Sequence, residues 1–454
     1  TDLNHSLEQI LLFADFTEDV AQSLKFIIDI LVSETDRLSS SDTLRLAKRE
    51  ISKHFYDIYK SCLIKTFEND RYPYVIHLFL TFGFMDERLL TEEQLTFIST
   101  AEYEESSSPC QIYTMPQWLR AIYDGKKEPS KNDFDEDYEE SLRSQRKNGY
   151  ITEAEEKTLA TDNLKKTFFE IDNLLTSCSK GVSGHISTFV PVLYTDSFIG
   201  DINRTFVTKE ALNEVATQLL SIDYSAFYRE EQYNNSSYKI DKEIILREVF
   251  PDIIIMPEYG INAYMWQEIS GRRRNSPGRF LFPAFSDSDL TDLMIKMFAR
   301  FRWELCRRIQ GPAWNDIQVK SLTSEYSDYV QFYRKNRDLS EERAEKLKLQ
   351  IQKAKKNTRE VFVLDYDLWI KKESTGGLVL NKISREFLST YCPFPKNLRG
   401  ELANNITFKE SMKRQQREYI KKIRELEAKF LKIEKNGYEV PIELQNTLRY
   451  YKEL

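Results

Sequence analysis

The sequence predicts a mainly α-helical protein with a central α/β portion, and three observations lead to this prediction. The 454 residues include only 14 Gly and 13 Pro, so residues that break helices are scarce. Apolar side chains recur at helical spacing through most of the chain. This pattern gives way only in the middle of the chain, after His185, to segments that are rich in β-branched and aromatic residues. The chain is too long for one ordinary core, so we expect several domains.

Charge is distributed unevenly along the sequence. Residues 1–270 carry 27 Lys+Arg and 47 Asp+Glu, a net charge of −20, whereas residues 271–454 carry 38 and 25, a net charge of +13. Such a division indicates either two halves that attract each other or a basic half that meets a polyanion.

Residues 1–105 are predicted to form an N-terminal helical domain. A helix is expected after Thr17-Glu18-Asp19, which is a good helix start before the apolar run 20–32. Residues 42–69 have apolar side chains at helical spacing, and Pro73 is suited to the first position of the next helix. Thr91 and Gln94 form a capping box that predicts one more helix.

Residues 106–150 are predicted to be an acidic linker or insertion. The acidic run from Asn132 to Glu140 has little to bury, and Glu104 to Pro109 forms a break before it. Between them, Met115 to Leu119 is expected to dock as one or two helical turns.

Residues 151–285 are predicted to form a long helix followed by a mixed α/β domain. A capping box at Thr152 and Glu155 opens the helix, which should continue to about Cys178. Strands are expected over Ile186–Tyr194 and Ile253–Met256, and helices over Thr208–Leu220 and Asp241–Val249.

Residues 286–454 are predicted to form a basic C-terminal helical domain. Ser288 caps a first helix, which should end at Gly311-Pro312. Ser340 starts a second helix that is expected to continue unbroken to Lys372, a length of about 50 Å at ~1.5 Å per residue.

Residues 408–435 keep a heptad of apolar side chains, which predicts a helical hairpin or a coiled coil that binds a partner. Asn436-Gly437 should end this helix, and Pro441 should open a last one. The residues predicted to contact a partner helix are Met412, Tyr419, Ile423, Leu426, Phe430 and Ile433.

A cluster of arginines is the most distinctive local feature. Planar guanidinium groups bind phosphate oxygens in pairs, and aromatic residues between them would suit single-stranded nucleic acid. The more common alternative is that these arginines pair with carboxylates of the same chain. The candidates for a polyanion site are Arg272, Arg273, Arg274, Arg279, Arg300, Arg307 and Arg308.

Other motifs that could carry chemistry are incomplete. The run that begins at Asp133 starts like a calcium loop but has Tyr138 where Gly is needed. Asp365 and Asp367 form a lone D-x-D pair within a predicted helix, where the two carboxylates should point apart. Three further combinations give weak signals for a metal or a nucleophile: Asp252 with Glu258 and Glu268, Cys178 with His185, and the four dispersed histidines. The sequence therefore predicts no metal, cofactor or catalytic residue.

Five widely spaced cysteines without a C-x-x-C motif indicate reduced thiols. The N-terminal residues lack the basic and apolar regions of a signal peptide, and no stretch is long and apolar enough to span a membrane. We therefore expect a cytoplasmic location.

Several blocks between Asp252 and Pro395 resemble uncharacterised bacterial proteins that sometimes carry a cyclic-nucleotide-binding module. The blocks are Met265–Ile269, Gly271–Phe280, Phe301–Glu304, Ser321–Tyr326, Tyr333–Arg337 and Tyr391–Phe394. The resemblance implies no known activity, and we transfer no residue role from it.

Together these observations predict a non-enzymatic scaffold or regulatory interaction protein that uses a basic face and the heptad helix. The partner would be another protein, or a second copy of the chain. Two alternatives remain open: a protein that binds nucleic acid or another polyanion, and an enzyme whose carboxylates meet only in three dimensions.

Overall fold

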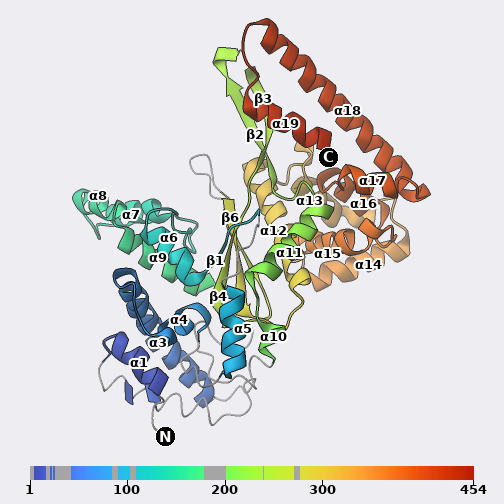
Figure 1. The fold of residues 1–454 in the computed structure, drawn as a ribbon. Coiled ribbons are helices and arrows are strands. Elements are labelled where there is room, and N and C mark those ends of the chain that lie inside the picture. Colours follow the sequence, from blue (N-terminus) through green and yellow to red (C-terminus); the bar gives the residue numbers. More distant parts are fainter. Residues whose placement is uncertain are drawn as a thin grey trace. The chain divides into compact units, whose positions relative to one another are not determined.

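The computed structural model describes residues 5–16, 21–22, 24–25, 42–83, 90–102, 109–177, 201–238, 240–269 and 277–453. Within these ranges the chain is mainly helical, with a four-stranded and a two-stranded sheet (Figure 1). The predicted fold class, mainly α with a small α/β portion, is confirmed. None of the described helices is both long and apolar enough to cross a membrane.

The chain divides into two compact units. Unit 1 comprises the described parts of Thr1–Asn213, Asp252–Glu268 and Arg279–Asp289, and unit 2 those of Glu214–Pro251, Ile269–Gly278 and Leu290–Leu454. This division differs from the four consecutive domains that the sequence predicts, because each unit combines segments that are distant along the chain.

Unit 1 begins with a helix that the sequence did not predict, and then contains the helices predicted over 42–69, after Pro73 and after Thr91. The capping box at Thr91 is present, because the Thr91 hydroxyl accepts from the Gln94 amide at 3.1 Å and the Gln94 side chain accepts in return at 2.9 Å. The helix expected over 20–32 falls largely outside the described residues. The described helices here are α1 (His5–Phe13), α3 (Asp42–Glu68), α4 (Tyr74–Phe82) and α5 (Glu92–Glu102).

Gly83 ends α4 in a left-handed conformation with a φ of +82°. A Cβ atom at this position would lie 2.6 Å from the carbonyl oxygen of Pro257, which is closer than real Cβ atoms approach. Glycine is therefore required here both by the backbone conformation and by the neighbouring strand.

We expect Gly83→Ala to lower the free energy of unfolding of unit 1 by roughly 2–4 kcal/mol, from left-handed strain and the clash together. Gly149→Ala is the matched control, because Gly149 has a φ of +77° and open space around it. Gly149→Ala should lower the free energy of unfolding only by the strain of the left-handed backbone, about 1–2 kcal/mol. Urea denaturation followed by hydrogen exchange in α4 measures both. Equal losses in the two variants would contradict the contact with Pro257.

Part of the segment predicted as a linker or insertion belongs to the core of unit 1, where the piece expected to dock, Met115–Leu119, is helical. Strand β1 (Ile112–Thr114) joins the sheet, and the Trp118 side chain of α6 (Met115–Tyr123) is fully buried. A capping box at Asp137 and Glu140 opens α7 (Tyr138–Lys147) within the acidic run. The acidic composition hid α7, because Asp137 and Glu140 of this run form its capping box.

The long helix expected from Thr152 to Cys178 is two helices. The capping box at Thr152 opens α8 (Glu153–Ala160) as predicted. The helix then stops at Thr161, and the Asp162 side chain accepts from the Lys165 amide at 3.1 Å, which starts α9 (Asn163–Ser177). An aspartate that caps a new helix explains the break.

The four-stranded sheet belongs to unit 1 and has the order β1-β4-β6-β5. The predicted strand over Ile253–Met256 is confirmed as β4 (Asp252–Tyr259), which pairs in parallel with β1 and with β6 (Pro277–Phe285). Its apolar run is buried, as expected for a strand inside a parallel sheet. Strand β5 (Tyr264–Ile269) completes the sheet, and α10 (Ile202–Thr205) precedes it in the chain. The strand expected over 186–194 lies outside the described residues.

The helix predicted over Asp241–Val249 is a strand. Residues Ile240–Glu248 form β3, which pairs antiparallel with β2 (Tyr228–Asn235). The Ile245 side chain is buried in a small core with Ile433 and Leu444. Long-range packing of Ile245 with Ile433 and Leu444 outweighs the helical spacing that the local sequence suggests.

The remaining helices of unit 2 include one more correction. The single helix expected from Ser340 to Lys372 is broken by Lys355 and Lys356, whose φ angles of 51° and 60° are left-handed. The Asn357 side chain then caps a new helix by accepting from the Arg359 amide. The helices are α11 (Lys209–Ile222), which begins in unit 1, α12 (Leu290–Gln310), α13 (Leu322–Phe332), α14 (Glu341–Lys353), α15 (Thr358–Lys371), α16 (Lys382–Tyr391) and α17 (Lys396–Leu402).

The C-terminal hairpin is present as predicted. Helix α18 (Ile406–Lys435) ends at Asn436-Gly437, and α19 (Ile442–Glu453) follows Pro441. Both helices pack with the β2–β3 hairpin around the small core of Ile245, Ile433 and Leu444. We call β2, β3, α18 and α19 the arm of unit 2 (Figure 1).

Candidate functional site

The predicted arginine cluster does not form one surface among the described residues. Arg272, Arg273 and Arg274 lie outside them. Arg279 is buried in unit 1, where its guanidinium donates to the Ser130 hydroxyl and, at 2.9 Å, to the Glu128 carbonyl oxygen. It also lies 4.5 Å from the centre of the Trp118 ring.

The arginines of α12 contact carboxylates of unit 2. Arg300 donates twice to Glu360, at 3.2 and 3.0 Å, and Arg307 donates to Glu304 at 2.6 Å. Arg308 is partly buried on the same helix. The positive charge of Arg300 and of Arg307 is thus countered within the chain, which is the alternative that the sequence left open. Polyanion binding by Arg272, Arg273 and Arg274 stays a prediction.

Arg302, which is not among the candidates for a polyanion site, holds a buried network in unit 2. Its guanidinium donates to both oxygens of Asp223, at 2.6 and 2.7 Å, and to the Tyr391 carbonyl oxygen at 2.9 Å. The Tyr366 hydroxyl also donates to Asp223, at 2.6 Å. Burial would lower the pKa of Arg302, but the attraction and hydrogen bonding of Asp223, together with smaller effects of Cys392 and Tyr366, raise it. The network therefore keeps a charged pair inside the core.

The carboxylates considered as metal ligands have protein partners. Asp365 is buried and accepts from the Gln350 amide at 2.7 Å and the Tyr326 hydroxyl at 3.1 Å, whereas Asp367 pairs with Lys371 at 2.6 Å. Burial raises the pKa of Asp365 despite these hydrogen bonds. Asp252 pairs with Lys127 at 3.1 Å. Across the described ranges, no three His, Cys, Asp or Glu side chains are grouped to hold a metal ion.

The described cysteines are free thiols. Burial raises the pKa of Cys62 and of Cys110 to about 12, so both stay protonated at neutral pH. Cys178 and His185 lie outside the described residues. Cys62 and Cys110 are therefore packing residues rather than nucleophiles.

The heptad face of α18 packs against other elements of unit 2, inside the arm and at α16 and α17. Met412, Leu426 and Ile433 are buried, and Phe430 packs against the small core that includes Ile245 of β3. Tyr419 and Ile423 are partly buried, and the Arg399 guanidinium lies 4.8 Å from the Tyr419 ring. The chain itself covers the face that was predicted to bind a partner helix.

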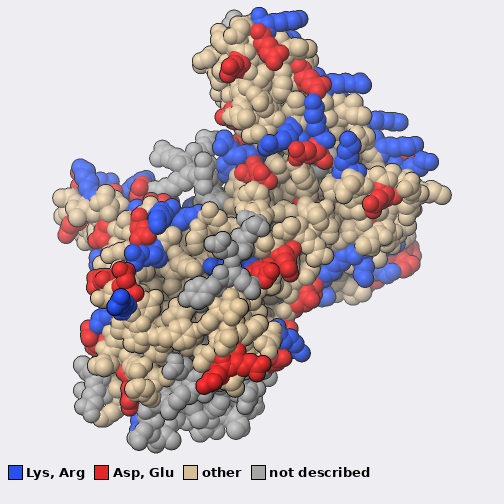
Figure 2. Space-filling view, viewed as in Figure 1, with Lys and Arg blue, Asp and Glu red and all other residues tan. Residues whose placement is uncertain are grey.

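The opposite face of α18 is exposed along its whole length. One line of residues, spaced three or four positions apart, faces away from the buried side chains, and all of its members are exposed. We call it the outer stripe: Ile406, Lys409, Lys413, Arg417, Ile420, Arg424, Ala428, Leu431 and Lys435. It contains five cationic residues, four apolar residues and no carboxylate. Figure 2 shows Lys and Arg side chains projecting along α18.

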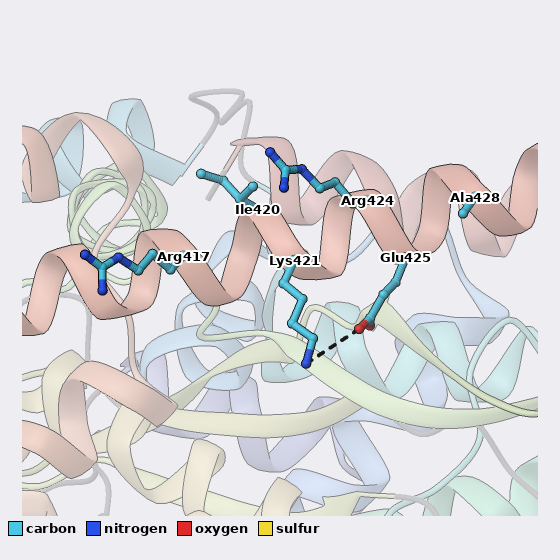
Figure 3. Close-up of a pocket in the computed structure, with 6 residues that line it drawn as sticks. All are labelled: Arg417, Ile420, Lys421, Arg424, Glu425 and Ala428. Carbon is cyan, nitrogen blue, oxygen red and sulfur yellow. Dashed lines mark ion pairs between the residues drawn. The ribbon is translucent and has the colours of Figure 1, made fainter.

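The middle of the outer stripe borders an open hollow of ≈ 610 Å³, whose lining comes from α18 alone. Figure 3 shows Ile420 between Arg417 and Arg424, while Lys421 points to the side of the helix where Glu425 lies 3.9 Å away. Neither Arg417 nor Arg424 forms an ion pair with any part of the chain that the structure describes. Two guanidinium groups therefore flank an exposed aliphatic side chain.

Comparison with known proteins adds one result. A family model, described as a domain of unknown function (DUF8509), matches residues 311–450. The matched segment lies in unit 2 and includes all of α18. No curated protein and no solved structure matches the sequence.

Sequence reasoning identified α18 and named its heptad face for partner binding, which stays a prediction, but it did not single out the opposite, exposed face. The heptad of large apolar residues drew attention, yet that face is covered by β3 and α19. The signal for the outer stripe was present: basic residues recur every three or four positions opposite the heptad.

Proposed function

We propose that this chain is a non-enzymatic interaction protein that binds an acidic partner protein through the outer stripe of α18. The observation that supports the proposal is that Arg417 and Arg424 are exposed and have no ion-pair partner among the described residues, on a helix whose other face is packed. Exposed cations without carboxylate partners attract an anionic surface and steer its approach. A rigid, well-packed helix presents them in fixed positions.

A protein partner is favoured over nucleic acid because the outer stripe mixes cations with aliphatic residues. Ile406, Ile420 and Leu431 are 87, 38 and 57% exposed, and a phosphodiester backbone offers nothing apolar to cover them. Proteins that bind single strands also use aromatic side chains as stacking platforms. The outer stripe contains no aromatic residue, and Tyr419 of the same helix lies under Arg399.

The test compares binding of the full chain to fluorescent poly-glutamate and to a 20-base-pair DNA duplex over a salt series. We expect the chain to bind poly-glutamate. The double variant Arg417→Glu/Arg424→Glu should weaken that binding at least about tenfold, because two attractive charges become repulsive. The matched control, Lys346→Glu/Lys353→Glu on α14, makes the same change in net charge and should bind as the wild type does.

Two outcomes would overturn the proposal. One is equal weakening in both double variants, since the effect would then reflect net charge rather than α18. The other is tighter binding to the duplex than to poly-glutamate with a steep dependence on salt, which would favour the nucleic-acid alternative.

A further inference from the structure

The aliphatic residues of the outer stripe indicate the shape of the partner's surface, which the charges alone do not define. Ile406, Ile420 and Leu431 lie on the same line of the helix surface, 14 and 11 residues apart, with cations between them. At ~1.5 Å per residue these intervals are about 21 and 17 Å. Apolar side chains repeated on one face over such a length form a seam that suits a second straight helix.

The distribution of charge defines the face of that second helix. Lys413 and Arg417 lie between Ile406 and Ile420, and Arg424 lies between Ile420 and Leu431. A helix that placed apolar residues against the three aliphatic side chains would bring its own intervening positions to the cations. Glu or Asp at those positions would form the flanking ion pairs that select partners in helix–helix pairing.

We infer that the partner presents an acidic amphipathic helix, whose apolar residues pack on Ile406, Ile420 and Leu431 and whose carboxylates face Lys413, Arg417 and Arg424. The inference rests on the proposed function and adds the form of the partner. A membrane surface fits less well, because helices that lie at lipid interfaces commonly use Trp or Phe there, and the outer stripe has neither.

The probe is a synthetic 30-residue helical peptide with Leu residues at matching spacings and Glu residues between them on one face. A control peptide of identical composition carries the same leucines on the opposite face. Fluorescence anisotropy with the full chain should show at least about tenfold tighter binding of the matched peptide. Equal binding of the two peptides would overturn the inference.

Variants of the chain separate this inference from the proposed function. Ile420→Ser/Leu431→Ser should weaken the matched peptide about tenfold and leave poly-glutamate binding unchanged, because the cations remain. Leu349→Ser on α14 is the control, since Leu349 is as exposed as Leu431, at 57%. One outcome separates the two proposals. If Ile420→Ser/Leu431→Ser binds the matched peptide as the wild type does, while Arg417→Glu/Arg424→Glu binds it more weakly, the inference of a helical partner is wrong and the proposed function stands.

Two further outcomes complete the test. Undiminished peptide binding by Arg417→Glu/Arg424→Glu would overturn both the inference and the proposed function. Vesicles with anionic lipids are the remaining probe. If the chain binds them more tightly than it binds the matched peptide, the partner is a membrane surface and the inference of a helical partner is wrong.

Discussion

Replacing Asp223 by Ala is expected to destabilise unit 2 by about 3–5 kcal/mol, because the substitution leaves the Arg302 guanidinium charged, buried and without its counterion. The loss extends to the Tyr366 hydroxyl, which donates to the same carboxylate at 2.6 Å. Arg302 would keep its hydrogen bonds to the Tyr391 carbonyl oxygen and the Ser225 hydroxyl, but two neutral acceptors do not replace a carboxylate.

Hydrogen exchange in α12 and α15 measures this effect, because these helices carry Arg302 and Tyr366. Both should exchange faster in Asp223→Ala. The double variant Asp223→Ala/Arg302→Met should be less destabilised than the single variant, since it removes the unpaired charge as well. Glu342→Ala, which breaks an exposed ion pair with Lys346, is the control and should change little. Additive losses in the double variant would show that the pair is not coupled.

Glu170→Ala is expected to have an effect of similar size on unit 1, again about 3–5 kcal/mol. The buried Glu170 carboxylate accepts from the Trp118 indole at 2.7 Å and from both the amide and the hydroxyl of Ser130, each at 2.6 Å. Arg279 lies 3.9 Å away. Removing the carboxylate therefore leaves three buried donors without their acceptor and takes a negative charge from beside the buried Arg279.

The readout for Glu170 is hydrogen exchange in α6 and α9, the helices of Trp118 and Glu170. Glu170→Gln should fall between the wild type and Glu170→Ala, because an amide oxygen can accept some of these bonds but carries no charge. The control is Glu153→Ala, which removes an exposed partner of Lys157. Exchange in α6 that stays at the wild-type rate in Glu170→Ala would contradict the structural role given to this network.

Local signals predicted the elements that local physics determines. The capping boxes at Thr91 and Thr152 mark helix starts because their hydrogen bonds lie within four residues. The break at Asn436-Gly437 and the buried run of β4 are likewise decided by nearby residues. These predictions needed no knowledge of the rest of the fold.

The errors arose where distant residues decide the outcome. Ile245 is in a strand because it packs with Ile433 and Leu444, nearly two hundred positions further along the chain. The same contacts decide which face of α18 is covered, so the sequence could predict the helix but not its available face. The left-handed Lys355 and Lys356 break a helix without a glycine or proline to signal it.

The path of the chain has a consequence for how this protein can change. The backbone passes from one unit to the other five times between Asn213 and Leu290. A single cut therefore releases neither unit whole, and a recombination event that exchanges one continuous stretch of gene within this region carries pieces of both. Residues 311–450, taken alone, lack Asp223 for Tyr366 and Ile245 for Ile433. The two units therefore have to be inherited together, although each has a hydrophobic core of its own.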